Sequence, residues 1–216
     1  MIKTILFDFD GTIADSVPVI IDIVHNLARK SGDAKLIAKL ENIDLESVRN
    51  QTILETCRKL GIPFFRIPLI MKKAQGEYRQ RITTVKLITG IKDVLTDLKK
   101  SGFILGIISS NQKENIERFV QNNKIDVFDY IHTEKTLFGK HKAIKHFLQK
   151  YRLKPNEVLY IGDEIRDVEA CKKVCVPIVA VTWGFNSQAG LEKYKPDFIC
   201  DAPAKLCKLI YAQNQN

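Results

Sequence analysis

Residues 2–12, IKTILFDFDGT, join a short apolar run to two aspartates and a glycine. The apolar part is rich in strand-forming residues, which predicts a buried β-strand over residues 2–9. Because side chains alternate along a strand, Asp8 and Asp10 would point the same way, about 7 Å apart at the usual strand rise. Gly11 permits a tight turn that brings backbone N–H groups close to an oxyanion. We therefore expect a strand that ends in a reactive acidic site.

Similar apolar runs recur along the chain and alternate with segments of helical periodicity. The predicted later strands are 103–108, 127–132, 157–161, 177–182 and a last short one at 197–200. This alternation favours an α/β fold, a Rossmann-like doubly wound parallel sheet with helices on both faces. Ligands of such sheets bind outside the carboxyl ends of the strands.

The stretch from Val17 to Leu87 interrupts the alternation, because it shows helical patterns and no convincing strand. Breaks near Gly32, at 42–44 and at 61–63 divide it into about four helices. We therefore expect an α-helical cap domain over residues 16–87, inserted into an α/β core domain made of residues 1–15 and 88–216.

Composition narrows the class of partner. The 216 residues include 34 Lys and Arg against 25 Asp and Glu, a net charge of +9, which favours anionic partners. Residues 16–88 hold 13 basic and 7 acidic side chains and so carry +6 of this excess. No dense basic run or aromatic-interleaved basic stripe occurs there, which argues against nucleic acid.

Location and redox state are also predicted from the sequence. No apolar stretch is long enough to span a bilayer and Met1 leads straight into the first strand, so we expect a cytoplasmic protein without a membrane partner. The five cysteines lack zinc-ligand spacing and are expected to be reduced packing residues. No motif bears on the oligomeric state.

Polar clusters follow two further predicted strands. Ser109-Ser110-Asn111 ends one strand, and Gly162-Asp163-Glu164-Ile165-Arg166-Asp167 follows another. Carboxylate oxygens are the ligands that Mg²⁺ prefers, together with water and phosphate oxygens. A hydroxyl, a lysine (Lys140 or Lys142) and a cation beside two carboxylates would form a clamp for a phosphoryl group.

With these motifs in order, the chain resembles the haloacid dehalogenase (HAD) superfamily over nearly its whole length, most closely its phosphoglycolate-phosphatase-like branch with a helical cap. The resemblance implies that Asp8 is the nucleophile and Asp10 the general acid and base. The family's lysine matches Lys140, with Lys142 as the alternative. The serine or threonine that ends the second strand matches Ser110 rather than Ser109.

The remaining site residues also follow from the resemblance. Mg²⁺ would be held by Asp8, the backbone carbonyl of Asp10 and Asp163. Asp167 would be a further ligand, directly or through water, or would only orient the loop, a role that Glu164 could share. Substrate would contact Gly11, Thr12 and Asn111. Separately from the resemblance, the +6 excess of residues 16–88 suggests that one cap cation reaches the non-reacting end of the substrate, and Arg49, near a helix expected to begin around Asp44, is the candidate.

The implied function is a Mg²⁺-dependent phosphatase, phosphoglycolate-phosphatase-like, that hydrolyses a small phosphorylated metabolite through an aspartyl-phosphate. Asp10 points to phosphate esters, because family members that cleave carbon–halogen or carbon–phosphorus bonds lack an acid there. Two alternatives stay open at this point: a sugar phosphomutase of the same branch, and a non-catalytic phospholigand-binding regulatory module.

Overall fold

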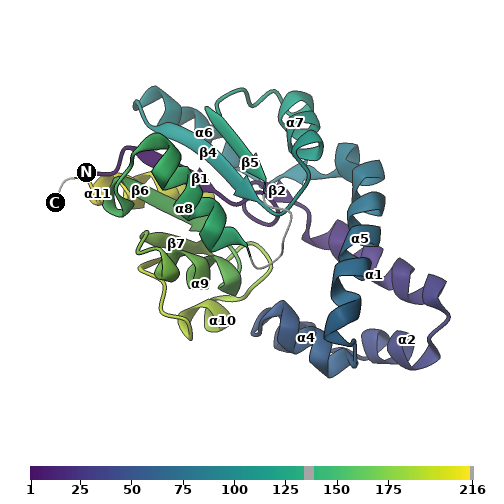
Figure 1. Cartoon of the computed structure of the whole chain (residues 1–216). Coiled ribbons are helices and arrows are strands. Elements are labelled where there is room, and N and C mark those ends of the chain that lie inside the picture. The colour runs from purple at the N-terminus through teal and green to yellow at the C-terminus, as the bar shows by residue number, and fades with distance from the viewer. Residues whose placement is uncertain (134–138, 215–216) are drawn as a thin grey trace.

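The computed structural model describes residues 1–133 and 139–214. At its centre lies a six-stranded sheet in the order β5-β4-β1-β6-β7-β8, in which all neighbours are parallel (Figure 1). The strands are β1 (Thr4–Phe7), β4 (Ile104–Ser109), β5 (Tyr130–Thr133), β6 (Val158–Gly162), β7 (Ile178–Val181) and β8 (Phe198–Cys200). The expected doubly wound α/β fold is confirmed.

Helices cover both faces of the sheet because its strands are apolar on both sides. Along β1, Ile5 and Phe7 belong to one buried cluster and Leu6 to the other. The helices that pack on the first face are α6 (Ile91–Lys100), α7 (Lys113–Asn122) and α11 (Pro203–Ala212). Those on the second face are α8 (Lys140–Tyr151), α9 (Ile165–Lys173) and α10 (Gln188–Glu192), with η3 (Pro155–Glu157) leading into β6. Burying one such aliphatic side chain contributes about 1.5–3 kcal/mol, so this core fixes the strand ends that carry the site.

One carboxylate fixes the edge of the sheet where β5 begins. Asp129 accepts a hydrogen bond from the backbone N–H of Leu105 at 2.9 Å and pairs with the Lys99 ammonium at 2.6 Å. Burial alone would raise the pKa of Asp129, but these two donors more than offset it and the pKa is lowered. The ionised carboxylate therefore belongs to the native state.

The inserted helices lie between two short strands, β2 (Ala14–Asp15) and β3 (Lys86–Leu87), which pair antiparallel. They extend beyond the sheet rather than covering it (Figure 1). The elements are α1 (Val17–Ser31), α2 (Ala34–Glu41), α3 (Leu45–Arg49), α4 (Ile53–Leu60), η1 (Phe64–Arg66), α5 (Ile67–Arg81) and η2 (Ile82–Thr84). A small apolar cluster of Ala28, Leu40 and Leu60 holds α1, α2 and α4 together. We refer to these helices as the cap; the predicted limits of a cap domain, residues 16–87, stay a prediction.

The expected breaks between cap helices coincide with observed ends. α1 ends before Gly32, whose positive φ of 68° suits glycine, and α4 ends before Gly61 in the same conformation. A further break separates α3 from α4, where Thr52 and Glu55 form a capping box. In the part of the chain that is described, no helix is both long and apolar enough to cross a membrane.

Candidate active site

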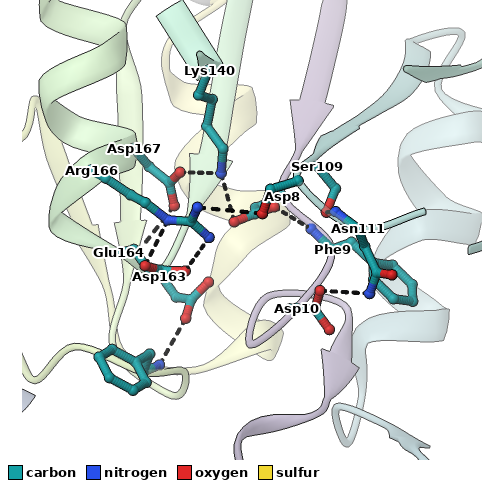
Figure 2. Close-up of polar contacts among 12 residues, drawn as sticks. Asp8, Phe9, Asp10, Ser109, Asn111, Lys140, Asp163, Glu164, Arg166 and Asp167 are labelled. Atoms are coloured by element: carbon teal, nitrogen blue, oxygen red, sulfur yellow. Dashed lines mark hydrogen bonds and ion pairs between the residues drawn. The ribbon is translucent and has the colours of Figure 1, made fainter. Parts of the chain in front are cut away.

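The polar residues singled out in the sequence meet at the carboxyl ends of three adjacent strands, β4, β1 and β6 (Figure 2). Asp8 and Asp10 follow β1, Ser109 ends β4, and Asp163 follows β6. Because parallel strands end at one edge of the sheet, residues more than 150 positions apart in the chain come into contact there: the Thr12 hydroxyl donates to Asp163 at 2.7 Å.

Lys140, the first residue of α8, reaches between two carboxylates (Figure 2). Its ammonium donates to Asp8 Oδ2 at 2.7 Å and also pairs with Asp167. Burial alone would lower the pKa of Lys140, but the carboxylates of Asp167 and Asp8 outweigh this and the pKa is raised. Lys142 is exposed on the same helix. The geometry therefore favours Lys140 over Lys142 as the lysine of the site.

The other oxygen of Asp8 is also held. Its Oδ1 accepts a hydrogen bond from the backbone N–H of Phe9 at 2.7 Å, and the side chain is buried. Asp8 is thus fixed by one backbone donor and one ammonium, and side-chain rotation is restricted. A carboxylate held in this way is preorganised to react at one position.

Asp163 is enclosed by backbone. It accepts hydrogen bonds from the Thr12 hydroxyl on Oδ1 and from the Phe185 N–H on Oδ2, each at 2.7 Å. A Cβ at Gly11 or at Gly184 would stand 2.2 Å from Asp163 Oδ2, and Gly11 also has a φ of +76°. Glycine is therefore required at both positions for the backbone to close around this carboxylate.

Asp8, Asp163 and Asp167 form a buried acidic cluster in which one carboxylate oxygen from each residue lies within 4.8 Å of those from the other two. Burial, followed by the charges of Glu164, Asp8 and Asp167, raises the pKa of Asp163 well above its ordinary value. Burial likewise raises the pKa of Asp167 to about 6, although Lys140 opposes it. Crowded carboxylates with one ammonium among them leave negative charge uncompensated. This donor set, three hard oxygen ligands, fits a divalent cation.

Asp10 lies apart from this cluster and faces the cap. The Tyr78 hydroxyl, on α5, donates to its Oδ1 at 2.7 Å, and the Asn111 amide donates to its Oδ2 at 2.8 Å. Burial raises the pKa of Asp10, and the two hydrogen bonds only partly offset the rise. A carboxyl group with a raised pKa is suited to carry a proton, and here it is reached by a cap residue.

The two serines at the end of β4, the last strand residue Ser109 and the next residue Ser110, have different surroundings. Ser109 is buried, and its hydroxyl accepts from the N–H of Asn111 at 3.1 Å. Ser110 lines the cavity described below, and its hydroxyl accepts from Nη1 of Arg166 at 3.3 Å. The structure thus separates the two, as strand alternation predicts; Ser110 as the phosphate contact stays a prediction.

A cavity of about 180 Å³ opens between Asp10 and the cap helices. Of the predicted substrate contacts, Gly11, Ser110 and Asn111 line it. Thr12 is buried and its hydroxyl donates to Asp163, which helps to position that carboxylate; Thr12 as a substrate contact stays a prediction. Arg49 is not among the described residues that line the cavity, and its assignment to the substrate stays a prediction without a supporting contact.

The backbone of Arg49 has a different role, because it connects the cap to the core. The buried side chain of Asn186 donates through Nδ2 to the carbonyl oxygens of Arg49 at 2.8 Å and of Gln51 at 3.0 Å. Its Oδ1 accepts from the N–H of Ile165 at 2.9 Å, at the start of α9. Asn186 therefore joins the cap to the loop that carries Asp163.

Sequence reasoning missed three side chains of this region: Tyr78, Asn186 and Arg166. Arg166 lies inside the acidic motif itself and is held by Glu164 through two hydrogen bonds, Nε to Oε2 at 2.7 Å and Nη2 to Oε1 at 2.5 Å. The position of Arg166 between Glu164 and Asp167 in the sequence could have indicated that it pairs with a carboxylate of the site. For Tyr78 and Asn186 the chain offers no local motif, since their partners are distant in sequence.

Comparison with known proteins agrees with this geometry. A family model described as haloacid dehalogenase-like hydrolase matches residues 5–181. The chain belongs to this family. The match spans β1 to β7 and so includes every strand that carries a residue of the site.

Individual relatives cover almost the whole chain. A phosphoglycolate phosphatase of Synechococcus elongatus is 30% identical over 209 residues, 96% of this chain and 97% of the relative. A pyrophosphatase PpaX of Bacillus cereus is 25% identical over 220 residues, 100% of this chain and 99% of the relative. A haloacid dehalogenase-like hydrolase from Streptococcus pneumoniae has a structure that superposes with a TM-score of 0.76 at 27% identity, covering 97% of this chain and 98% of that one. The predicted family and the prediction of a phosphatase-type hydrolase are confirmed.

Proposed function

We propose that the protein is a Mg²⁺-dependent phosphatase that hydrolyses a small phosphorylated metabolite through an aspartyl-phosphate, in the manner of phosphoglycolate-phosphatase-like enzymes. The observation that carries the proposal is the placement of two carboxylates in different settings. Asp8 is fixed by Lys140 and the Phe9 N–H, whereas Asp10 faces the cavity with a raised pKa. Such a pair divides nucleophilic attack from proton transfer.

In the first half of the reaction an oxygen of Asp8 attacks phosphorus and the bond from phosphorus to the leaving oxygen breaks. The proton on Asp10 passes to that oxygen, so the product leaves as an alcohol. In the second half Asp10 takes a proton from water, the water oxygen attacks phosphorus, and the bond from phosphorus to Asp8 breaks. Inorganic phosphate leaves, Asp8 is again a carboxylate and Asp10 is again protonated.

The other residues support these steps. Lys140 stays charged beside Asp8 and offsets the repulsion between the carboxylate and the incoming phosphate. Ser110 and Asn111 line the cavity near Asp10, where phosphate oxygens would be bound. Mg²⁺ bound by Asp8, Asp163 and Asp167 would neutralise negative charge on both the carboxylates and the phosphate. The carbonyl of Asp10 remains a predicted further ligand.

The test is the variant Asp8→Asn, assayed by phosphate release from p-nitrophenyl phosphate with Mg²⁺ present. An amide cannot form the acyl-phosphate, so activity should fall below about 1% of wild type. Lys142→Ala, on the exposed side of α8, serves as the control and should retain activity. Mass spectrometry after an acid quench should find one added phosphoryl group in the wild type only. Substantial turnover by Asp8→Asn would refute the assignment of the nucleophile.

A further inference from the structure

The cavity in front of Asp10 has two chemically different walls. The core contributes polar groups, among them Ser110, Asn111 and Arg166. The cap contributes a wall that is mostly aliphatic, formed by Val17, Ile20, Ile23 and Val24 of α1, Ile53 of α4, and Ile70, Met71 and Ala74 of α5. Gln75 and Tyr78 of α5 are the polar side chains beside it, and Tyr78 is bound to Asp10. The side of the cavity that faces away from the phosphate chemistry is therefore apolar.

The positive charge of the cap lies elsewhere. Lys30 pairs with Glu77, and Arg81 pairs with Asp22. Lys39 donates to the carbonyl oxygens at the end of α4. Among the described residues that line the cavity, none from the cap is a lysine or an arginine. The +6 excess of the inserted segment thus does not reach the part of the site that a leaving group would occupy.

Among the described residues that line the cavity, the cation is Arg166, which comes from the core and is already hydrogen-bonded. Glu164 binds it through two hydrogen bonds, and its third contact is to the Ser110 hydroxyl. These contacts hold the guanidinium beside Ser110, whose backbone carbonyl accepts a hydrogen bond from Gln75 of α5 at 3.3 Å. An anionic group placed against the cap wall would lose its hydration and find no cation on that wall among the described residues.

The size and position of the cavity also indicate which leaving group it would hold. Asp10, which would protonate the leaving oxygen, lines this cavity, so the group attached to that oxygen must enter it. A cavity of about 150 Å³ with a Leu, Ile and Phe lining is large enough to bind benzene, and this one measures about 180 Å³. A ring or a short branched chain therefore fits the space.

We propose that the preferred substrate is a phosphate monoester whose leaving group is uncharged and largely apolar, of about the size of one ring, bound against Ile20, Ile70 and Met71. The inference rests on the proposed phosphatase function and names its substrate class. It separates this chain from the relatives named above, since phosphoglycolate carries a carboxylate on its leaving group and pyrophosphate a second phosphate.

The experiment compares kcat/KM for three probes with Mg²⁺ present: benzyl phosphate, phosphoglycolate and pyrophosphate. Benzyl phosphate and phosphoglycolate are both esters of a primary alcohol and differ in the remote group, which isolates recognition of that group. We expect benzyl phosphate to exceed the other two by at least tenfold. An equal or higher kcat/KM for either anionic probe would overturn the inference but leave the phosphatase assignment intact. Failure to release phosphate from p-nitrophenyl phosphate as well would overturn both.

Two variants on the same helix sharpen the test. Met71→Arg places a cation on the cap wall and should shift the ratio of benzyl phosphate to phosphoglycolate by at least tenfold toward phosphoglycolate. Leu69→Arg makes the same kind of change two residues away, at a side chain that is 56% exposed and does not line the cavity, and should leave the ratio within twofold of wild type. Equal shifts in both variants would refute the apolar wall as the recognition surface.

If Met71→Arg does not fold, Ile20→Lys makes the corresponding change from α1, with folding checked by the near-ultraviolet circular dichroism of each variant. The wild-type ratio needs no variant and decides the inference by itself.

Discussion

Asn186→Asp tests whether contact between the cap and the core is needed for turnover. The replacement keeps an oxygen to accept from the Ile165 N–H, so the start of α9 retains its partner. It removes the two bonds that Nδ2 donates, at 2.8 Å to Arg49 and 3.0 Å to Gln51. An acceptor then faces two carbonyl oxygens, and the cap keeps at this point only its bonds to Ser187, whose N–H donates to the Arg49 carbonyl at 2.9 Å and whose hydroxyl donates to Asn50 Oδ1.

The size of the effect follows from the number of bonds lost. Each hydrogen bond contributes about 1 kcal/mol net, so the closed arrangement should lose about 2 kcal/mol relative to an open one. Since about 1.4 kcal/mol is a factor of ten, the equilibrium constant between the closed and the open arrangement falls by about 30-fold. If the cap must close over substrate, kcat/KM should fall by up to the same factor.

The assay is kcat/KM on p-nitrophenyl phosphate, together with urea denaturation to confirm that the variant is folded. Asn26→Asp is the matched control, since it makes the same chemical change on α1, where, among the described residues, the Asn26 side chain bonds only to the exposed Asp22. A folded Asn186→Asp protein that loses less than twofold in kcat/KM would refute the reasoning, as would an equal loss in the control.

Three further predictions concern the chemistry and the fold. Asp10→Asn should lower kcat by about 10² to 10⁴-fold. The loss should be larger for alkyl than for aryl phosphates, because a poor leaving group depends most on protonation. Equal losses of kcat on both substrates would contradict the role of Asp10 as the general acid. Chelation by EDTA should abolish phosphate release and added Mg²⁺ should restore it; full activity after exhaustive chelation would rule out metal dependence. Asp163→Ala should raise the half-saturating Mg²⁺ concentration more than Asp167→Ala does, because the wild-type Asp167 carboxylate is already paired with Lys140. Asp129→Asn should lower the free energy of unfolding by about 1 kcal/mol at pH 7, and because the folded pKa of Asp129 is lowered, this stabilisation is present above the unfolded pKa and lost as pH falls through the folded one. Urea midpoints should therefore differ between wild type and Asp129→Asn at neutral pH and converge as the pH falls below the folded pKa of Asp129, whereas a constant difference would show that the carboxylate charge is not involved.

The strands that carry the chemistry were predictable because each is buried on both faces. β1, β4 and β6 are continuous apolar runs, and a polar residue that directly follows such a run must lie at the edge of the sheet. That reasoning places Asp8 and Asp163 at one site without any knowledge of contacts. Strand ends still shifted by up to three residues: the strand expected at 127–132 is observed at Tyr130–Thr133.

The cap was less predictable because its helices depend on tertiary contacts. The break between α3 and α4 did have a local signal, Thr52 followed by Glu55, which form a capping box. The direction of the Arg49 side chain had no such local signal, because α3 has only five residues and so short a helix does not define which of its sides faces the cavity. Tyr78 and Asn186 reach partners 68 and 137 positions away, and no periodicity encodes such a pairing.

The division of the cavity between core and cap has an evolutionary consequence. Residues that move the phosphoryl group lie on loops after the sheet strands, whereas the surface that would meet the leaving group lies on α1 and α5. A substitution on those two helices can alter which ester is accepted while leaving the carboxylates, Lys140 and their mutual hydrogen bonds in place. The range of accepted substrates can therefore change under selection while the reaction stays the same. Relatives that share a quarter to a third of their residues can thus accept different esters and still perform the same displacement at phosphorus.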